Sequence, residues 1–343
     1  MAALTDLLPT AVAKVPHPVF VLSYEQKNIT SDITPYVRSV TYTDYLSGQS
    51  DELEVELEDA DGRWVRHWYP GKGDTLSLKI GYEAAPLLPC GAFEIDEIEF
   101  AQPPATVSIR GLATGIKKSV RTRLGLSYEN TTLAAIAQRI AKRNKLTLTG
   151  KIRDIRIDRV TQYKERDIEL LTRLAMEYGH AFKIVGRKLV FTDIADLRSG
   201  KSVATLKATD LIAIRLRDKI KDIYRNAKVT YHDPKTKKLV VSEVKDDRVA
   251  SGDTLKLSGR SASKATAEAK GRAALDEANQ QQTAGSLTLQ GNPKLVAGVT
   301  FDLADCGKLS GKYLIESARH HLDRGGYTTE LEVKRVALQE RKS

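Results

Sequence analysis

The segment from Gly285 to Val336 alternates apolar with small or polar side chains, and short groups of turn residues interrupt the alternation. A period of two is typical of strands that bury one face, so the segment predicts several short strands joined by turns. The apolar positions are Leu287, Leu289, Val299, Phe301, Leu303, Leu331 and Val333, and the turn residues are Gly291-Asn292-Pro293, Gly307, Gly311 and Gly325-Gly326.

A second β-rich region runs from about residue 17 to 113. Strands are predicted at 19–23, 37–45, 53–57, 76–80, 93–100 and 107–109, and turns at 47–48, 59–62, 70–74 and 103–104. Six short strands with such turns predict a small antiparallel barrel. Within it, Leu53, Val55 and Leu57 are expected to face a core. The acidic row Glu52, Glu54, Glu56 and Glu58 then faces outward, either as a docking edge or as a solvated strand face.

The hydrophobic period changes to 3.6 after about residue 114. Leu133, Ile136, Ala137 and Ile140 predict an amphipathic helix that ends near Asn144, with Asn130 and Thr131 as capping candidates. A second helix is predicted over 167–178, where Gly179 provides the stop. A hairpin of strands at 181–185 and 189–191 follows.

Strands return at 211–217, 227–231 and 239–244, and an Ala-rich helix with a thin apolar stripe is predicted over 261–282. This helix is expected to pack against a barrel or against another subunit. The predicted fold class is α+β, mainly β, with two small antiparallel β-barrel domains and an inserted α/β domain of helices and hairpins. The predicted boundaries are a 1–16 N-terminal arm, a 17–113 first β-barrel, a 114–202 insertion domain, a 203–338 second β-barrel with its helix near 261–282, and a 339–343 C-terminal tail.

Composition excludes several classes of protein. No window approaches the roughly 18 apolar residues of a membrane helix, so no stable membrane insertion is expected. Cys90 and Cys306 are the only cysteines, too few for a disulfide framework or a zinc site, and both are expected to be small buried hydrophobes. The first 15 residues lack a basic start, which is not typical of a secretory signal, so folding in a reducing cytoplasm is expected.

The charge distribution is uneven, although the net charge of +10 is modest for this length. Acidic residues collect at 51–61 and 94–99, which suits stacking against copies of the chain or charged neighbours, although solvated faces are the simpler alternative. Basic residues gather in the middle of the chain, at Lys117, Lys118, Arg121, Arg123, Arg139, Lys142, Arg143, Lys145, Lys151, Arg153, Arg156 and Arg159.

The sequence offers few residues for chemistry. His320 and His321 with Asp323 have the residue types of a metal site, but adjacent residues on a strand point to opposite faces. Asp96, Glu97 and Glu99 have the residue types of an acid and base pair, as in a cell-wall hydrolase, but an acidic strand surface explains them equally. We therefore predict no catalytic, cofactor-binding or metal-binding residues, no cofactor, and no enzyme activity.

The order of these features resembles the late control protein D family, the central hub of contractile phage tails. The resemblance spans most of the chain and rests on many weak features rather than one signature. They are the 285–336 segment with Tyr313 and Tyr327, the acidic strand and loop at 51–62 with Trp64, the 70–74 turn, the 91–96 strand, and the helix and hairpin at 166–191.

The resemblance implies a structural role in the baseplate of a virion or phage-tail-like particle, assembled in the host bacterial cytoplasm. Family members resemble trimeric hubs related to the amino-terminal part of VgrG, in which each chain contributes two similar barrels. The implied homotrimer adapts a sixfold tail tube to a threefold spike. Implied partners are the central spike protein, the tail tube or tube-initiator protein, the tape measure and the baseplate wedge proteins, with nucleic acid only in transit through the lumen.

Two further expectations accompany this resemblance. The chain ends at Ser343, soon after the second predicted barrel, so spike and wall-cleaving functions are expected in other chains. The alternative function is a nucleic-acid-binding module that uses the central basic region. It predicts affinity for duplex DNA that falls with salt and is lost when Lys117, Lys118, Arg121 and Arg123 are neutralised.

Overall fold

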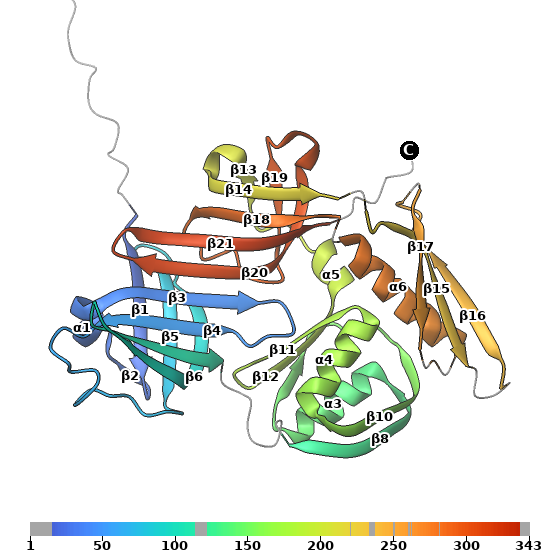
Figure 1. Cartoon of the computed structure of the whole chain (residues 1–343), viewed down its shortest axis with the longest axis horizontal. Helices are drawn as coiled ribbons and strands as arrows, with labels where there is room; N and C mark the ends of the chain where they lie inside the picture. Colours follow the sequence, from blue (N-terminus) through green and yellow to red (C-terminus); the bar gives the residue numbers. More distant parts are fainter. Residues whose placement is uncertain are drawn as a thin grey trace, which may run out of the picture.

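The computed structural model describes residues 16–113, 122–219, 221–232, 237–249, 251–259, 261, 263–280 and 282–336. Its described part is mainly β, as the sequence predicts, with one long sheet of 13 strands and three smaller sheets (Figure 1). The predicted N-terminal arm (except Pro16), the C-terminal tail, and Lys117, Lys118 and Arg121 lie outside the described residues.

The long sheet crosses both β-rich regions of the chain. Its strands pair in an antiparallel manner, apart from the parallel pair of β13 with β19. In order across the sheet they are β14 (Leu211–Asp218), β18 (Thr283–Gln290), β21 (Gly326–Arg335), β20 (Gly311–Asp323), β3 (Val37–Tyr45), β4 (Glu52–Glu58), β7 (Thr106–Ala113), β6 (Leu88–Ala101), β5 (Thr75–Tyr82), β1 (Pro18–Tyr24) and β2 (Lys27–Asn28), with β19 (Thr300–Ala304) joined to β20 and β13 (Thr205–Lys207) to β19.

The sequence predicted two small antiparallel β-barrel domains, and the described strand pairings do not close either of them into a barrel. Among the described residues the strand order from β14 to β2 is an open path. The reason is the pairing of β20 with β3, from Ser317 opposite Tyr45 to Asp323 opposite Ser39, which joins the two β-rich regions edge to edge. Sequence periodicity predicts single strands and says nothing of such a junction.

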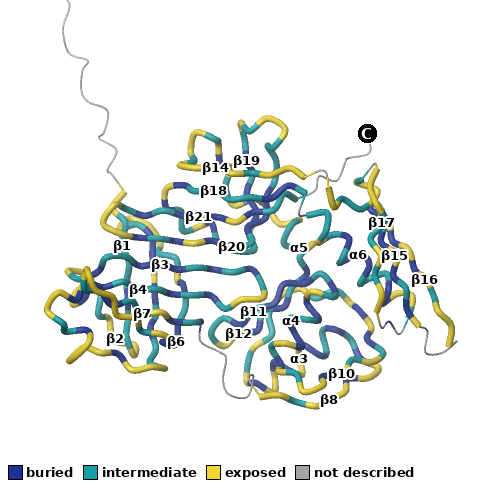
Figure 2. The backbone as a smooth tube through the Cα atoms, in the orientation of Figure 1, coloured by how far each residue is buried: buried dark blue, intermediate teal, exposed yellow. Residues whose placement is uncertain are grey.

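Hydrophobic cores cover one face of the long sheet. In Figure 2 the buried residues of its strands are dark blue. In the first core, Leu53 and Val55 on β4 and Ile80 on β5 are at most 1% exposed, and Phe93 on β6 is fully buried. Under β18, β20 and β21, Leu287 and Tyr313 belong to a second core. The short helices α1 (Thr30–Ile33), η1 (Thr34–Tyr36), η2 (Ala208–Asp210) and η3 (Gly307–Leu309) lie in the connections.

An α/β body, residues 122–199, lies beside the long sheet (Figure 1). Helices α3 and α4 share its core with the sheet residues Phe182 and Phe191. Its helix α3 begins after Thr132, whose Oγ1 accepts the N–H of Ala135, so the cap is this residue rather than Asn130 or Thr131. The elements are β8 (Arg123–Thr132), α3 (Leu133–Arg143), β9 (Thr147–Thr149), β10 (Arg156–Arg166), α4 (Asp167–Tyr178), β11 (His180–Val185), β12 (Lys188–Asp193) and α5 (Ile194–Ser199).

A third part of the chain packs one helix on a small sheet. Its strands β15 (Tyr224–His232), β16 (Leu239–Lys245) and β17 (Asp253–Ser258) pair with no strand of the long sheet among the described residues. Helix α6 (Lys264–Gln280) covers this sheet. The side chain of Asn279 accepts the N–H of Tyr224 and donates to its carbonyl oxygen, both at 2.8 Å. The thin apolar stripe of α6 is therefore buried within the chain. The predicted domain boundaries stay a prediction. The region predicted as a second barrel, 203–338, also contains this separate sheet of β15, β16 and β17.

Candidate functional site

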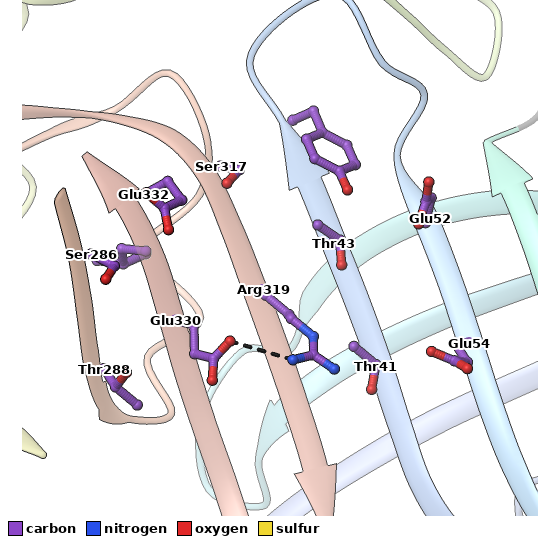
Figure 3. Close-up of a pocket in the computed structure, with 12 residues that line it drawn as sticks. Thr41, Thr43, Glu52, Glu54, Ser286, Thr288, Ser317, Arg319, Glu330 and Glu332 are labelled. Carbon is purple, nitrogen blue, oxygen red and sulfur yellow. Dashed lines mark hydrogen bonds and ion pairs between the residues drawn. The ribbon is translucent and has the colours of Figure 1, made fainter. Parts of the chain in front are cut away.

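The face of the long sheet opposite the cores is polar and hollowed. It results from strand alternation, because Leu53, Val55 and Leu57 point to the core and the side chains between them point away, as predicted. The hollow holds about 550 Å³ (Figure 3). We call this whole side of the long sheet, opposite the cores, the polar face. Residues lining the hollow are Thr41, Thr43, Tyr45, Glu52, Glu54, Ser286, Thr288, Ser317, Arg319, Glu330, Leu331 and Glu332.

Among the residues that line the hollow, four glutamates face a single cation, Arg319. Arg319 Nη1 lies 3.4 Å from Glu330 Oε2 on the neighbouring strand, the contact drawn in Figure 3. Glu54 faces Arg110, whose Nη1 lies 2.9 Å from Glu97 Oε2. Partial burial raises the pKa of Glu332, and nearby Glu330 acts in the same direction while Arg217 opposes it. The polar face thus carries a negative, hydroxyl-rich surface across both β-rich regions.

The long sheet contains the same four-strand arrangement twice. We call β3, β4, β6 and β7 the first module, and β14, β18, β20 and β21 the second module. When the four strands of a module are numbered along the chain, they lie side by side in the order first, second, fourth, third in both modules. The third strand of each module, β6 or β20, is long and pairs through its first half with a preceding strand, β5 or β19. Identical order in eight strands indicates an internal repeat.

Equivalent residues support the repeat. Gly73 and Gly298 have φ angles of 91° and 87°. The N–H of Gly73 donates to the carbonyl of Ile95 at 2.8 Å, and the N–H of Gly298 donates to that of Ile315 at 2.9 Å. Both isoleucines are buried. The two modules therefore agree in backbone conformation and hydrogen bonding as well as in strand order.

Both ends of this eight-strand path carry strand edges. β14 is the first strand of the sheet among the described residues, and Ile212 and Ile214 on it are 65% and 42% exposed. β6 pairs with β5 only through Leu88–Glu94, so its second half has a described strand on one side only. Phe100 in that half is 49% exposed. Sequence analysis missed both edges, because an edge is a property of the pairing.

The structure separates the two adjacent histidines. His320 is fully buried, its Nδ1 lies 2.8 Å from Tyr327 Oη, and its ring stacks on Tyr42. Burial lowers the pKa of His320 to about 4. His321 points the other way and contacts Thr41, with its Nε2 3.4 Å from Asp323 Oδ2. Among the described residues no group of three or more His, Cys, Asp or Glu is placed to hold a metal ion.

The acidic residues considered for catalysis lie along the second half of β6. Asp96, Glu97 and Glu99 are all exposed, and Glu97 is engaged with Arg110. They line an open edge, and none of the three borders the described hollow. Of the two cysteines, Cys90 is buried as expected, whereas Cys306 is only partly buried.

Many basic residues of the middle region have internal partners. Arg143 donates to the fully buried Asp167 and to Tyr128 Oη. Arg153 Nε lies 2.8 Å from Asp193 Oδ2. These two arginines help to hold the α/β body together. Three further ion pairs in this part are Lys151 with Asp196, Arg156 with Asp158, and Arg159 with Glu129.

Among the described residues, no helix combines the length and the apolar character that a membrane-spanning helix requires.

Known proteins resemble the chain in sequence and in fold. A probable baseplate hub protein of Escherichia phage 186 is 33% identical over 196 residues, which make up 56% of this chain and 50% of the relative. The chain thus spans about half the length of the curated relatives it matches. The 43 kDa tail protein of prophage MuSo2 from Shewanella oneidensis has a similar fold, with a TM-score of 0.70 at 17% identity over 93% of this chain and 98% of that one.

A third similar structure is the E. coli c3393 protein, a component of the type VI secretion system described as similar to the T4 tail proteins gp27 and gp5. Its TM-score is 0.56 at 12% identity, over 89% of this chain and 74% of that one. Identities this low establish the fold alone. The family match is in the sequence itself and covers residues 106–326. It extends over most of the chain, from β7 of the first module through β20 of the second, so the chain belongs to the phage tail baseplate hub (GPD) family.

Proposed function

We propose that three copies of this chain form a ring at the centre of a contractile-tail baseplate, in a phage or a phage-tail-like particle. The observation that supports the ring is the internal repeat of four strands within one continuous sheet. A threefold ring of such chains presents six similar modules to one side and three identical chains to the other. It can therefore match a sixfold tail tube and a threefold spike.

The polar face is proposed to line the channel of this ring. The hydrophobic cores cover the other face of the sheet, so a closed ring has room for them only on its outside. Glu52, Glu54, Glu330 and Glu332 would then face the channel with Arg319 as the cation among the hollow's lining residues. Such a surface repels phosphates, which suits nucleic acid in transit rather than binding.

The proposed partners follow from the proposed position. Above the ring are the tail tube or tube-initiator protein and the tape measure, below it is the central spike protein, and around it are the baseplate wedge proteins. Each chain would contribute barrel-like modules to these contacts. The role is structural, without a catalytic step, and the placement of Asp96, Glu97 and Glu99 on an open strand edge supports this.

Native mass spectrometry of the full chain, co-expressed with its neighbouring reading frames, tests the proposal. We expect three copies of this chain bound to three copies of a spike-like partner. A ring of six copies, or a monomer bound to each neighbour in one-to-one complexes, would contradict the trimeric hub.

A further inference from the structure

The two strand edges of the long sheet belong to opposite ends of the repeat. β14 is the first strand of the second module, and the second half of β6 is the outer end of the first module. Long edges with exposed apolar side chains are sites where another chain adds a strand. Ile214 on β14 pairs with the core residue Leu287, and Phe100 on β6 pairs with the core residue Val107, so each edge exposes an apolar side chain on the core side of the sheet.

The chain itself shows how two modules join. Within one copy, the third strand of the second module, β20, pairs in an antiparallel manner with the first strand of the first module, β3. The two edges left over are therefore the third strand of the first module, β6, and the first strand of the second module, β14. They are the same two kinds of edge that meet in the internal junction.

We propose that the second half of β6 in one copy pairs with β14 of the next copy, in the register that β20 and β3 use. The proposal rests on the trimeric ring proposed above and names its interface. Strand direction is compatible, because the path from β14 to β6 contains eight antiparallel strands, so its two ends run in opposite directions. Each copy thereby offers one edge and receives the other, and the sheet closes around the ring.

Irregularities in the pairing fix the register. The β20–β21 pair has a bulge at Glu316, and the β6–β7 pair has one at Asp96. The β3–β4 pair has a bulge at Arg38, and the β14–β18 pair has one at Ile212. We align Glu316 with Asp96 and Arg38 with Ile212. Each residue pair of the β20–β3 junction then predicts a residue pair between β6 of one copy and β14 of the next.

The strands between the edges give the same alignment independently. Arg110 on β7 pairs with Glu97 and Glu54, and Glu332 on β21 pairs with Ser317 and Ser286. Thr41 is then equivalent to Arg215, because the former pairs with Glu54 and the latter with Ser286. This is the equivalence that the bulges give, so the register is consistent across all four strands.

In the transferred register, opposite charges meet on the polar face. The internal pair Arg319 with Thr43 becomes Glu99 with Arg217 in the junction between copies. The internal pair Ser317 with Tyr45 becomes Glu97 with Lys219. Glu97, Glu99, Arg217 and Lys219 are all exposed in the isolated chain. Opposite charges that face each other directly stabilise antiparallel strand pairs, whereas like charges destabilise them. Both charged pairs of this register combine a glutamate with a cation.

Apolar groups meet on the other face of the same junction. Phe100 takes the place of His320 and Leu216 the place of Tyr42, a pair of rings that stack within the chain at a centroid distance of 6.0 Å. Phe100 is half-exposed in the isolated chain, and the proposed neighbour would cover it. Charge and apolar surface therefore match on the two faces at once, which indicates a second copy of this chain as the occupant.

Cysteine pairs test the register directly. Directly opposed residues in antiparallel strands have Cα atoms about 4.5–5.5 Å apart, within the range of a disulfide. We expect Glu99→Cys with Arg217→Cys, in a Cys306→Ser background of the full chain, to give covalent dimers and trimers on oxidation. The matched control is Glu99→Cys with Ala213→Cys, which lies four residues out of register on the same strand and should give at least tenfold less crosslinking.

Native mass spectrometry of the same samples separates the two proposals. A trimer that crosslinks through positions 99 and 217 supports the edge pairing. A trimer that crosslinks equally in the control, or not at all, overturns the edge pairing and leaves the trimeric hub intact. A lack of trimers in every sample, with the spike-like partner present, overturns both.

A charge exchange provides a second test that does not depend on disulfide geometry. Arg217→Glu alone should raise the trimer dissociation constant at least tenfold, because Glu99 then faces a carboxylate. Adding Glu99→Arg should return it to within about threefold of the original value. Two effects that simply add, without recovery in the double variant, would overturn the pairing of these residues.

Discussion

Buried ionisable side chains hold the junction between the two modules. His320 stacks on Tyr42 across the β20–β3 pair, and Lys183 reaches from β11 to Asp44 and Asp51 beside it. Burial raises the pKa of Asp51 to about 6, and the nearby carboxylate of Asp44 acts in the same direction, while the ammonium of Lys183 opposes the shift. These groups contribute to the stability of the junction in ways that single substitutions can measure.

Stability should depend on pH through His320. Burial lowers its pKa from 6.5 to about 4, so between these values the unfolded chain takes up a proton that the folded chain does not. The contribution is present above about pH 6.5 and is lost as pH falls, at roughly 1.4 kcal/mol per pH unit. We expect His320→Gln to reduce the loss of unfolding free energy between pH 7.5 and 5 by about 2 kcal/mol, measured by urea denaturation.

His321→Gln is the matched control, since His321 is partly exposed on the opposite face of the same strand. It should keep the pH dependence of the original chain. The account of His320 fails if His320→Gln and the original chain lose stability equally on acidification.

Lys183 should be far more important than an exposed lysine on the next strand. Its Nζ donates to Asp44 and lies 3.3 Å from both oxygens of Asp51. Lys183→Met leaves two buried carboxylates unpaired, which costs about 3–5 kcal/mol. Lys188→Met, at an exposed site, should change the unfolding free energy by less than about 0.5 kcal/mol. Equal effects of the two variants would show that the ion pairs contribute nothing.

At the scale of elements, the attachment of β14 depends on one close backbone approach. A Cβ at Gly285 on β18 would lie 1.9 Å from the carbonyl oxygen of Arg215. Gly285→Ala must therefore push β14 away from β18, at a cost of roughly 1–3 kcal/mol. Hydrogen exchange should show faster exchange at the amides of 211–218 while the amides of β20 stay protected.

Gly125→Ala is the control for this strand, because nothing lies within 4 Å of a Cβ there. It should leave the exchange of 211–218 unchanged. Unchanged exchange in Gly285→Ala as well would mean that the β14–β18 pair is not tightly held.

Helices were the elements that the sequence predicted best. The apolar face of α4 and the stop at Gly179, with a φ of 67°, predict its bounds to the residue. β8 and β10 were missed because charged residues interrupt their alternation, as at Arg156 and Arg159 in β10. The strong period of a buried helix face is a local signal, whereas a hairpin rich in arginine lacks one.

The family resemblance implied two similar barrels in each chain, but no repeat was recognised in the sequence itself, although a weak signal for it exists. Gly-x-Thr followed by two alternating apolar residues occurs at 73–78 and again at 298–303. Gly-x-aromatic-x-Ile-acid occurs at 91–96 and again at 311–316. The segments between these motifs differ in length, so no constant period marks the repeat. Only the pairing of strands makes the two copies comparable.

For the whole molecule, the repeat and the junction between modules together suggest how copies of the chain assemble. The acidic strand β4 was predicted as either a docking edge or a solvated face, and it lies inside the sheet with its glutamates on the polar face. Its edges are covered by β3 and β7, so it cannot dock another strand. The open edges are instead at β14 and β6, positions that depend on the order of all eight strands.

Electron cryomicroscopy of the assembled baseplate is the most direct test of the central claim. The account predicts three copies of the chain around one channel, a continuous inner sheet with sixfold pseudo-symmetry, and β6 of each copy paired with β14 of the next. A ring in which the polar face points away from the channel, or in which six copies each contribute one module, would contradict it.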